Sequence, residues 1–280
     1  MIQDIGEHTF DNQYHPCPPD RESYALYYED HAALVRKYPD RIEFPKFRDI
    51  ERLNEDIYED AVYLFSIDGE RYYLVEEINR ERQSHFTMEN TEIFRYAEPQ
   101  YLAFAGITGY QLHNWYQSRR FCGKCGRRMK KDSKERMLYC ESCHNMEFPK
   151  ICPAVIIGVT DGDKILMSKY AGRTYKKYAL LAGFTEIGET LEETVQREVM
   201  EEVGLHVKNI RYYKSQPWAL SGSLLAGFFC ELDGDDTISL QEDELSVGKW
   251  AHADDLELED DGISLTREMI LKFKEEHTKR

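Results

Sequence analysis

The 280-residue sequence predicts a mixed α/β (α+β) protein built from three successive blocks. After about residue 150, apolar segments of strand length alternate with amphipathic segments of helix length. Two closely spaced cysteine pairs precede that point. An Asp-Gly pair between two apolar segments marks a hairpin further upstream. We therefore expect an N-terminal α+β domain over 1–118, a small ribbon over 119–150 and an α/β domain over 151–280.

The first block combines a hairpin with one helix. The apolar segments 61–67 and 71–75 flank Asp68-Gly69, which is typical of a tight turn between antiparallel strands. Residues 101–117 predict a helix that carries Trp115 and Tyr116. No residue of this block suggests catalysis, since its histidines are scattered.

The second block contains two C-x-x-C pairs, and such a pattern is typical of a zinc ribbon. Four thiolates leave no open position on a tetrahedral ion, so the predicted zinc is structural. The alternatives are a redox pair or unrelated buried thiols. The three other cysteines, at 17, 152 and 230, have no partner at useful spacing and are expected to be small apolar residues. The predicted zinc ligands are Cys122, Cys125, Cys140 and Cys143.

The ribbon is also locally basic, although the chain has 52 acidic and 36 basic residues and a formal net charge of −16. The simpler interpretation is a set of solvated side chains on a ribbon that lacks its own core. The alternative is an anchor for a polyanionic substrate or an RNA tail. The basic residues are Arg119, Arg120, Lys124, Arg127, Arg128, Lys130 and Lys131.

The third block predicts strands at 154–159 and 164–168, joined by an Asp161-Gly162 turn. Further apolar segments cover 179–183, 207–214 and 224–232, with Lys249-Trp250 in a later one. A final helix is expected from about Leu265 to the C-terminus. A helix is also expected between the segments 179–183 and 207–214.

That helix follows Gly183 and carries an acidic cluster. Thr190 is a predicted N-cap with Glu193 as its capping-box partner, and Leu191, Val195 and Val199 mark a buried face. The spacing i, i+3, i+4 places three carboxylates on another shared face. Oxygen ligands suit a hard cation such as Mg²⁺ or Mn²⁺, whereas the alternative is a solvated acidic face. The three carboxylates belong to Glu198, Glu201 and Glu202.

The stretch from Gly183 to Leu205 resembles the Nudix box at every fixed position: glycine, five residues, Glu, seven residues, then Arg-Glu-apolar-x-Glu-Glu-x-Gly-apolar. This resemblance implies a Nudix α/β/α sandwich that hydrolyses a nucleoside diphosphate linked to another group. It implies that Glu198, Glu201 and Glu202 hold the metal ions and that Glu189 and Arg197 orient them.

The order of N-terminal domain, four-cysteine ribbon and Nudix domain resembles the bacterial NADH pyrophosphatases. By that analogy the carbonyl of Ala182 is a further metal ligand and Phe184 stacks on a base. Ser215-Gln-Pro-Trp218 matches a motif of that family, in which Ser223 also agrees. The resemblance thus implies substrate binding by Phe184, Gln216, Pro217, Trp218 and Ser223. The alternative for Trp218 is a core aromatic.

The chain departs from the family's Pro-Phe-Pro core, where it has Ala219-Leu220-Ser221. We expect a more flexible loop that lacks one stacking ring. Glu244 precedes Trp250 by six residues, as does a metal-binding glutamate of the family. It is expected to bind metal or to accept a proton from water, although Glu242 and Asp243 lie beside it and a solvated acidic loop is the alternative.

The predicted reaction is hydrolysis of NAD(H) to NMN(H) and AMP, with removal of 5′ NAD caps from RNA implied as a second activity. Within enzymes the alternative is a Nudix hydrolase for ADP-ribose or another nucleoside diphosphate derivative. The alternative that is not an enzyme is a non-catalytic nucleotide sensor. Composition predicts no membrane span and no secretory signal, so a cytoplasmic protein is expected. The family resemblance implies a homodimer.

Overall fold

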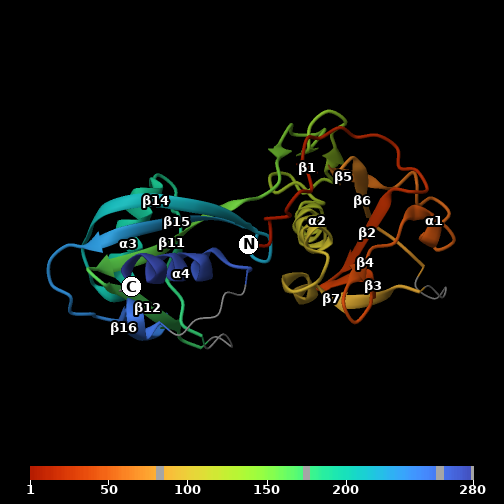
Figure 1. Cartoon of the computed structure of the whole chain (residues 1–280). Coiled ribbons are helices and arrows are strands. Elements are labelled where there is room, and N and C mark those ends of the chain that lie inside the picture. The colour runs from red at the N-terminus through yellow and green to blue at the C-terminus, as the bar shows by residue number, and fades with distance from the viewer. Residues whose placement is uncertain (80–84, 173–176, 257–261, 279–280) are drawn as a thin grey trace. The chain divides into compact units, whose positions relative to one another are not determined.

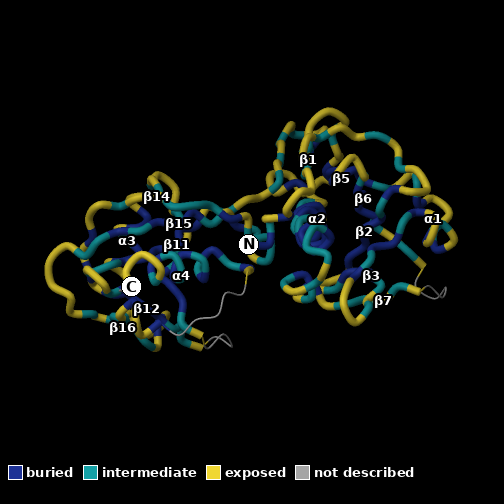
Figure 2. Tube along the Cα trace, in the orientation of Figure 1, coloured by how far each residue is buried: buried dark blue, intermediate teal, exposed yellow. Residues whose placement is uncertain are grey.

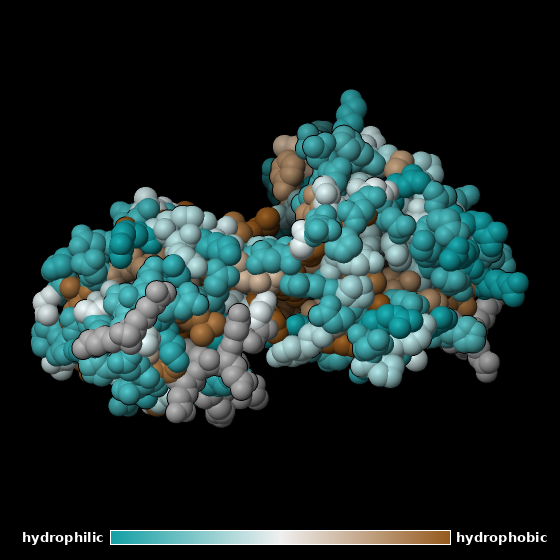
Figure 3. Space-filling model, in the orientation of Figure 1, coloured by the Kyte–Doolittle hydropathy of each residue, from teal (hydrophilic) through white to brown (hydrophobic). Residues whose placement is uncertain are grey.

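The computed structural model describes residues 1–79, 85–172, 177–256 and 262–278. The chain folds into two compact units, one from Ile2 to Lys150 and the other from Ile151 to Arg280, which also includes Met1. The finer division into 1–118, 119–150 and 151–280 stays a prediction. No helix of the described part is both long and apolar enough to cross a membrane. The visible face of each unit is mostly hydrophilic (Figure 3).

The N-terminal unit contains a seven-stranded sheet with the order β1-β5-β6-β2-β3-β4, in which β7 also pairs with β3. The predicted hairpin is confirmed, because β5 and β6 pair antiparallel and Asp68 and Gly69 have φ values of 53° and 79°. The strands of this sheet are β1 (Phe10–Asp11), β2 (Tyr24–Glu29), β3 (Ala32–Lys37), β4 (Ile42–Glu43), β5 (Val62–Ile67), β6 (Glu70–Val75) and β7 (Thr87–Asn90).

The predicted helix of the first block is confirmed as α2 (Gln100–Ser118). It is buried along most of its length, including Trp115 and Tyr116, and Figure 2 shows it as a mostly buried rod within its unit. Two short helices accompany it, α1 (Phe47–Ile50) and the 3-10 helix Thr91–Arg95. The ribbon has its own three-stranded sheet, of β8 (Lys130–Lys131), β9 (Leu138–Tyr139) and β10 (Met146–Glu147).

The C-terminal unit is a sheet between two helices (Figure 1). The sheet has the order β14-β15-β11-β12-β16, with β13 also paired to β11. One face packs on α3 (Leu191–Val203) and the other on α4 (Leu265–His277), through two separate apolar clusters. This is the expected α/β/α sandwich. The strands are β11 (Cys152–Asp161), β12 (Lys164–Tyr170), β13 (Leu181–Phe184), β14 (Val207–Trp218), β15 (Ser223–Leu232) and β16 (Leu245–His252).

The structure differs from the sequence prediction mainly at β14. We expected a strand that ends near Lys214, whereas the strand continues to Trp218. Pro217 lies in this edge strand, where a residue without an N–H group is tolerated. The segment that resembles a substrate loop is therefore the end of a hairpin between β14 and β15. A 3-10 helix, Ala253–Asp255, follows β16.

Candidate functional site

The helix of the Nudix-like segment begins and ends as its sequence predicts. Thr190 caps the first turn, and its capping box with Glu193 is complete: the Thr190 hydroxyl accepts from the Glu193 backbone, and the Glu193 carboxylate accepts from the Thr190 backbone. Gly204 ends the helix in the left-handed conformation, with φ 69°. The segment of acidic residues is thus held as a regular helix between two defined ends.

Two of the three box glutamates lie on the buried side of α3. Glu198 and Glu202 are 8% and 2% exposed, beside Val195 and Val199, whereas the Glu201 side chain is 52% exposed. The expectation of one separate carboxylate face is wrong in this respect. Residues 195, 198, 199 and 202 follow the i, i+3, i+4, i+7 pattern, so the acids share the stripe that packs toward the sheet.

Gly183 makes room for the Glu198 carboxyl group. A Cβ atom at position 183 would lie 1.9 Å from Cδ of Glu198, which is far inside any contact distance. Gly183 sits on β13 opposite Val155 of β11, so the strand backbone cannot easily retreat. The glycine of the motif is therefore required by the close approach of a helix carboxylate to a strand.

Arg197 connects the acidic residues to the strand. Its Nη1 donates to Glu198 Oε1 at 2.8 Å and to Glu201 Oε2 at 2.9 Å, and its Nη2 donates to the carbonyl of Phe184 at 2.9 Å. Both oxygens of Glu189 also accept from this guanidinium. A planar group with several fixed donors can hold such an arrangement, whereas a lysine cannot. The analogy that made Arg197 and Glu189 orienting residues agrees with these contacts.

The charges of the cluster have opposite effects on two glutamates. The hydrogen bonds from Arg197 lower the pKa of Glu189 to about 2, so this group stays ionised. Burial raises the pKa of Glu198, and the nearby charges of Glu201 and Glu244 raise it further against the opposing effect of Arg197. A buried carboxylate beside other carboxylates is stabilised by a cation.

The donor set fits a hard divalent cation, because every candidate ligand is a carboxylate or carbonyl oxygen. Among the described residues, the cysteines of the ribbon are the one set of three or more Cys, His, Asp or Glu ligands with donor atoms within 4.8 Å of one another. The carbonyl of Ala182 lies in β13, one residue before Gly183.

The loop that carries Glu244 is attached to the end of α3. The N–H of Ser239 donates to the carbonyl of Val203 at 2.9 Å, and the N–H of Gln241 donates to that of Glu202 at 3.0 Å. These bonds satisfy carbonyls that a helix end leaves open. Glu244 of this loop lies near enough to Glu198 for its charge to raise the pKa of that carboxyl group.

The residues expected to bind substrate lie at one end of the sheet. Backbone registers place Gln216, Leu225, Ala154 and Phe184 in one row across β14, β15, β11 and β13. Three strand spacings separate the ends of this row, roughly 14 Å. Phe184 is 55% exposed there. Ala182, two residues before Phe184, packs with the α4 cluster, so Phe184 belongs to the α4 face while Glu198 lies on the α3 face.

Gln216 holds the start of α4. Its side chain is fully buried, with Nε2 donating to the carbonyl of Ile263 at 2.7 Å and Oε1 accepting from the N–H of Leu265 at 2.8 Å. The family analogy made it a substrate ligand, whereas the structure shows its amide bound to the backbone of this helix end. Nothing near Gln216 in the sequence indicates that partner, which lies 47 residues away.

The turn after Trp218 is closed by hydrogen bonds. The N–H of Ser221 donates to the carbonyl of Trp218 and the N–H of Gly222 to that of Ala219, at 3.3 and 3.2 Å. The hydroxyl of Ser223, which is buried, lies 2.8 Å from that of Ser221. The segment expected to be flexible is thus an ordered turn. Pro217 is exposed and Trp218 half-buried at its base.

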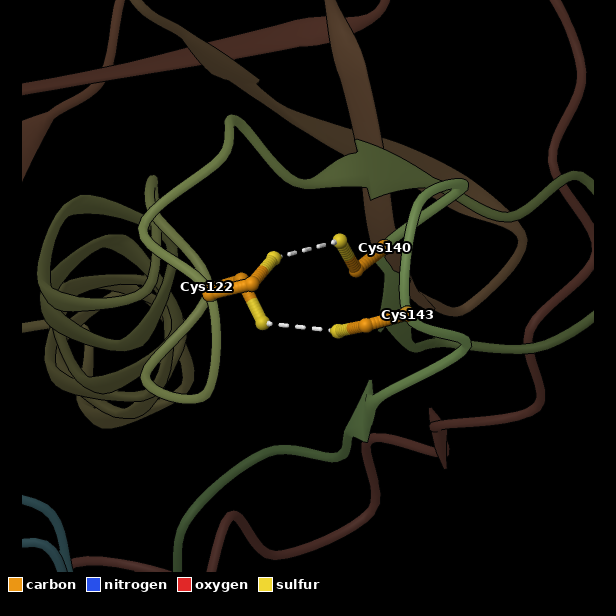
Figure 4. Close-up of side chains that lie close together, drawn as sticks. Cys122, Cys140 and Cys143 are labelled. Atoms are coloured by element: carbon orange, nitrogen blue, oxygen red, sulfur yellow. Dashed lines mark hydrogen bonds between the residues drawn. The ribbon is translucent and has the colours of Figure 1, made fainter.

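The four ribbon cysteines point toward one another (Figure 4). The Sγ atoms of Cys122 and Cys143 lie 3.5 Å apart, as do those of Cys125 and Cys140. Four sulfurs at such spacing suit a tetrahedral zinc ion with Zn–S bonds of about 2.3 Å. The backbone N–H groups of Cys143 and Ser142 lower the pKa of the Cys140 thiol to about 7, which favours the thiolate. All seven cysteines are free of disulfides.

The two halves of the cysteine site are built alike. Cys122 donates its N–H to Arg127 and accepts from Gly126, while Cys140 donates to Asn145 and accepts from His144. Gly126 and His144 both have positive φ, 74° and 58°. Two equivalent tight turns therefore present the thiols, and only the first uses the glycine that this conformation favours.

Comparison with known proteins agrees with this geometry. Residues 150–273 match the NUDIX domain, and residues 117–148 match the NADH pyrophosphatase zinc ribbon domain. The NAD-capped RNA hydrolase NudC of Pasteurella multocida is 35% identical over 186 residues, which cover 66% of this chain and 69% of that protein. The chain belongs to the Nudix family, in the group that carries an NADH pyrophosphatase zinc ribbon.

Other relatives match this protein over fewer residues than the Pasteurella multocida protein does. The proteins named NAD-capped RNA hydrolase NudC from Salmonella paratyphi C and Actinobacillus succinogenes are 41% and 42% identical over 150 and 153 residues. These matches cover 54% and 52% of this chain. In both cases the match spans 58% of the relative's own length.

Replacing Gly183 with alanine should reduce turnover by this Nudix chain. The added methyl group displaces the Glu198 carboxyl, and a displacement of about 1 Å at a reacting centre costs roughly 100-fold in rate. The measurement is kcat for NADH with Mn²⁺ present. Gly158→Ala is the control, because its Cβ would crowd the Phe229 ring at 2.7 Å and no carboxylate. Equal losses of kcat in both variants would contradict the explanation.

Proposed function

We propose that this protein hydrolyses the diphosphate bridge of NAD(H) and releases NMN(H) and AMP. The observation that carries the proposal is the close approach of the Glu198 carboxyl group to Gly183, with Glu201 joined to it through Arg197 and Glu244 near enough to raise its pKa. The exposed ring of Phe184 follows Gly183 on β13. The names of the relatives support NAD as the substrate class. Removal of NAD caps from RNA is part of the same proposal, because a capped RNA presents the same bridge.

In the proposed mechanism, the residues of the site have different roles. Glu198 and Glu202 would hold Mg²⁺ or Mn²⁺ together with the carbonyl of Ala182. A bound ion lowers the pKa of its water and neutralises phosphate charge. Arg197 fixes the Glu198 carboxylate through Nη1 and aligns the strand through the Phe184 carbonyl. Glu201 or Glu244 accepts the proton that water loses as its oxygen attacks one phosphorus. The bond from that phosphorus to the bridging oxygen breaks, and the bridging oxygen leaves as part of the phosphate of the other nucleotide.

We assign substrate contacts to the end of the sheet at which Phe184 and Trp218 lie. Phe184 offers an exposed ring for stacking on a base, and Trp218 lies at the other end of the site with Pro217. A span of roughly 14 Å between the outer strands accommodates two nucleotide moieties. Gln216 and Ser223 contribute to this site by shaping it: one holds α4 and the other holds the turn.

The proposal extends to assembly and location. A homodimer is proposed from the family resemblance, and sedimentation of the purified protein tests it. A cytoplasmic location is supported by seven cysteines without disulfides, four of them in a thiolate metal site. Both statements are independent of the reaction that the site performs.

A substrate panel tests the proposed reaction. The values of kcat/KM should be highest for NADH or NAD-capped RNA when compared with ADP-ribose and diadenosine diphosphates in the presence of Mn²⁺. A preference for ADP-ribose would assign the site to the other candidate function, which the missing Pro-Phe-Pro core favours. No hydrolysis of any compound would indicate a nucleotide sensor.

A further inference from the structure

The zinc ribbon and the end of α2 enclose a small cationic pocket within the N-terminal unit. The pocket has a volume of about 90 Å³, and its lining includes Arg119, Arg120, Arg128 and Lys131 against one carboxylate, that of Glu76. A pocket of this size has room for a small anion such as a single phosphate group. In a chain with a net charge of −16, this concentration of positive charge needs a separate explanation.

Two of the four cations are already paired. Lys131 Nζ lies 2.7 Å from Glu76, and Arg119 Nε lies 3.6 Å from Glu147. The side chains of Arg120 and Arg128 have no ion pair or hydrogen bond with any residue in the described ranges. The pocket therefore keeps two uncompensated guanidinium groups, and a guanidinium is the side chain that best matches phosphate oxygens.

The backbone holds these two arginines together. Phe121 and Arg128 form an antiparallel bridge, and the N–H of Met129 donates to the carbonyl of Arg120 at 2.9 Å. Both positions flank the first cysteine turn, two residues before Cys122 and three after Cys125. Both side chains are exposed and line the same pocket, so an anion can reach them from solvent. Attachment to a metal-bound turn also reduces the ordering cost of binding.

We propose that this pocket binds a phosphate group of a single-stranded RNA chain. Four cations against one carboxylate dominate the lining, so the expected contact is with the sugar-phosphate backbone and is independent of sequence. The substrate class rests on the proposed function, because a cap-removing enzyme must hold the RNA that follows the cap. Arg120 and Arg128 contact the phosphate, and Arg119 and Lys131 form the cationic wall around it.

The test measures binding of a fluorescein-labelled single-stranded oligoribonucleotide to the full-length protein. The double variant Arg120→Gln/Arg128→Gln should bind about tenfold or more weakly, because two charge-assisted contacts are lost. The slope of log K against log salt should fall by about 1.4, at roughly 0.7 per phosphate contact to a single strand. Zinc content should match the wild-type protein, which shows that the ribbon is folded.

The matched control is Lys124→Gln/Arg127→Gln. It removes the same charge from the same ribbon, from exposed positions outside the pocket lining. If the control variant weakened RNA binding as much as the pocket variant, the proposal would be overturned. RNA would then be attracted by the positive charge of the ribbon as a whole. Polyglutamate that competes as well as unlabelled RNA would overturn the preference for phosphate.

Hydrolysis of NADH separates this proposal from the proposed function. The pocket variant should keep wild-type kcat/KM for NADH while it loses kcat/KM for NAD-capped RNA. If the Arg120→Gln/Arg128→Gln variant hydrolysed NADH normally and bound RNA as the wild-type protein does, the RNA-binding role of the pocket would be refuted and the proposed function would stand. If RNA binding depended on Arg120 and Arg128 but the protein hydrolysed neither NADH nor NAD-capped RNA, the proposed hydrolysis would be refuted and the RNA-binding role of the pocket would stand.

Discussion

Replacing Glu202 with glutamine should lower kcat for NADH hydrolysis by on the order of 10²–10³-fold while the protein stays folded. The substitution keeps the shape of the side chain and removes one negative charge from a group that is only 2% exposed. A metal site loses affinity when a charged ligand becomes neutral. The measurement is kcat and KM with Mn²⁺ titrated over a wide range, because a lost ligand raises the Mn²⁺ concentration needed for half-maximal rate.

Thermal unfolding distinguishes a catalytic loss from a structural one. A buried charge among other carboxylates costs free energy, so Glu202→Gln should leave the Tm of the protein without added Mn²⁺ unchanged or higher. Glu192→Gln is the matched control, since it removes the same charge from an exposed position of α3. Full activity in Glu202→Gln, or an equal loss in Glu192→Gln, would remove Glu202 from the proposed site.

Replacing Cys140 with serine should release zinc and unfold the ribbon. Three strands of two residues each cannot form an independent core, so the metal must provide most of the folding free energy of this segment. Zinc binding contributes roughly 10–16 kcal/mol in isolated zinc-finger peptides, far more than such a segment contributes alone. The measurements are zinc content by elemental analysis and limited proteolysis between residues 119 and 150.

A cysteine outside the site provides the control for this experiment. Cys152→Ser changes a half-buried thiol that is not in the zinc set, and it should keep both the metal and the protease resistance. If Cys140→Ser retained one zinc ion per chain and resisted protease, the site would not be a structural zinc centre. Loss of zinc in both variants would point to general unfolding.

Much of the fold could be predicted because its signals are local. The Asp68-Gly69 turn, the Thr190 cap and the Gly204 end depend on residues within a few positions of one another. The cysteine set depends on spacing alone. The depth of Glu198 could not be found in this way, because it depends on Gly183 of a strand that packs against the helix. Only the fixed glycine indicated that a close approach was needed.

The partners of Gln216 and the position of Phe184 show the same limit. Gln216 lies in a motif whose family meaning is substrate binding, and its partners on α4 are set by how the sheet and helix pack. The alternation of β13 and β14 also places Phe184 and the helix carboxylates on opposite faces of the sheet. Strand periodicity predicts alternation, but which face meets which helix is a property of the tertiary structure.

The attachment of the Ser239–Glu244 loop to α3 has a consequence for motion. The amides of Ser239 and Gln241 close onto the last carbonyls of the helix, so they should resist hydrogen exchange to the same degree as that helix end. An exposed loop would otherwise exchange freely. Opening of the helix terminus and departure of Glu244 then become a single event. The two segments of the site, although distant in the sequence, should therefore open at the same rate.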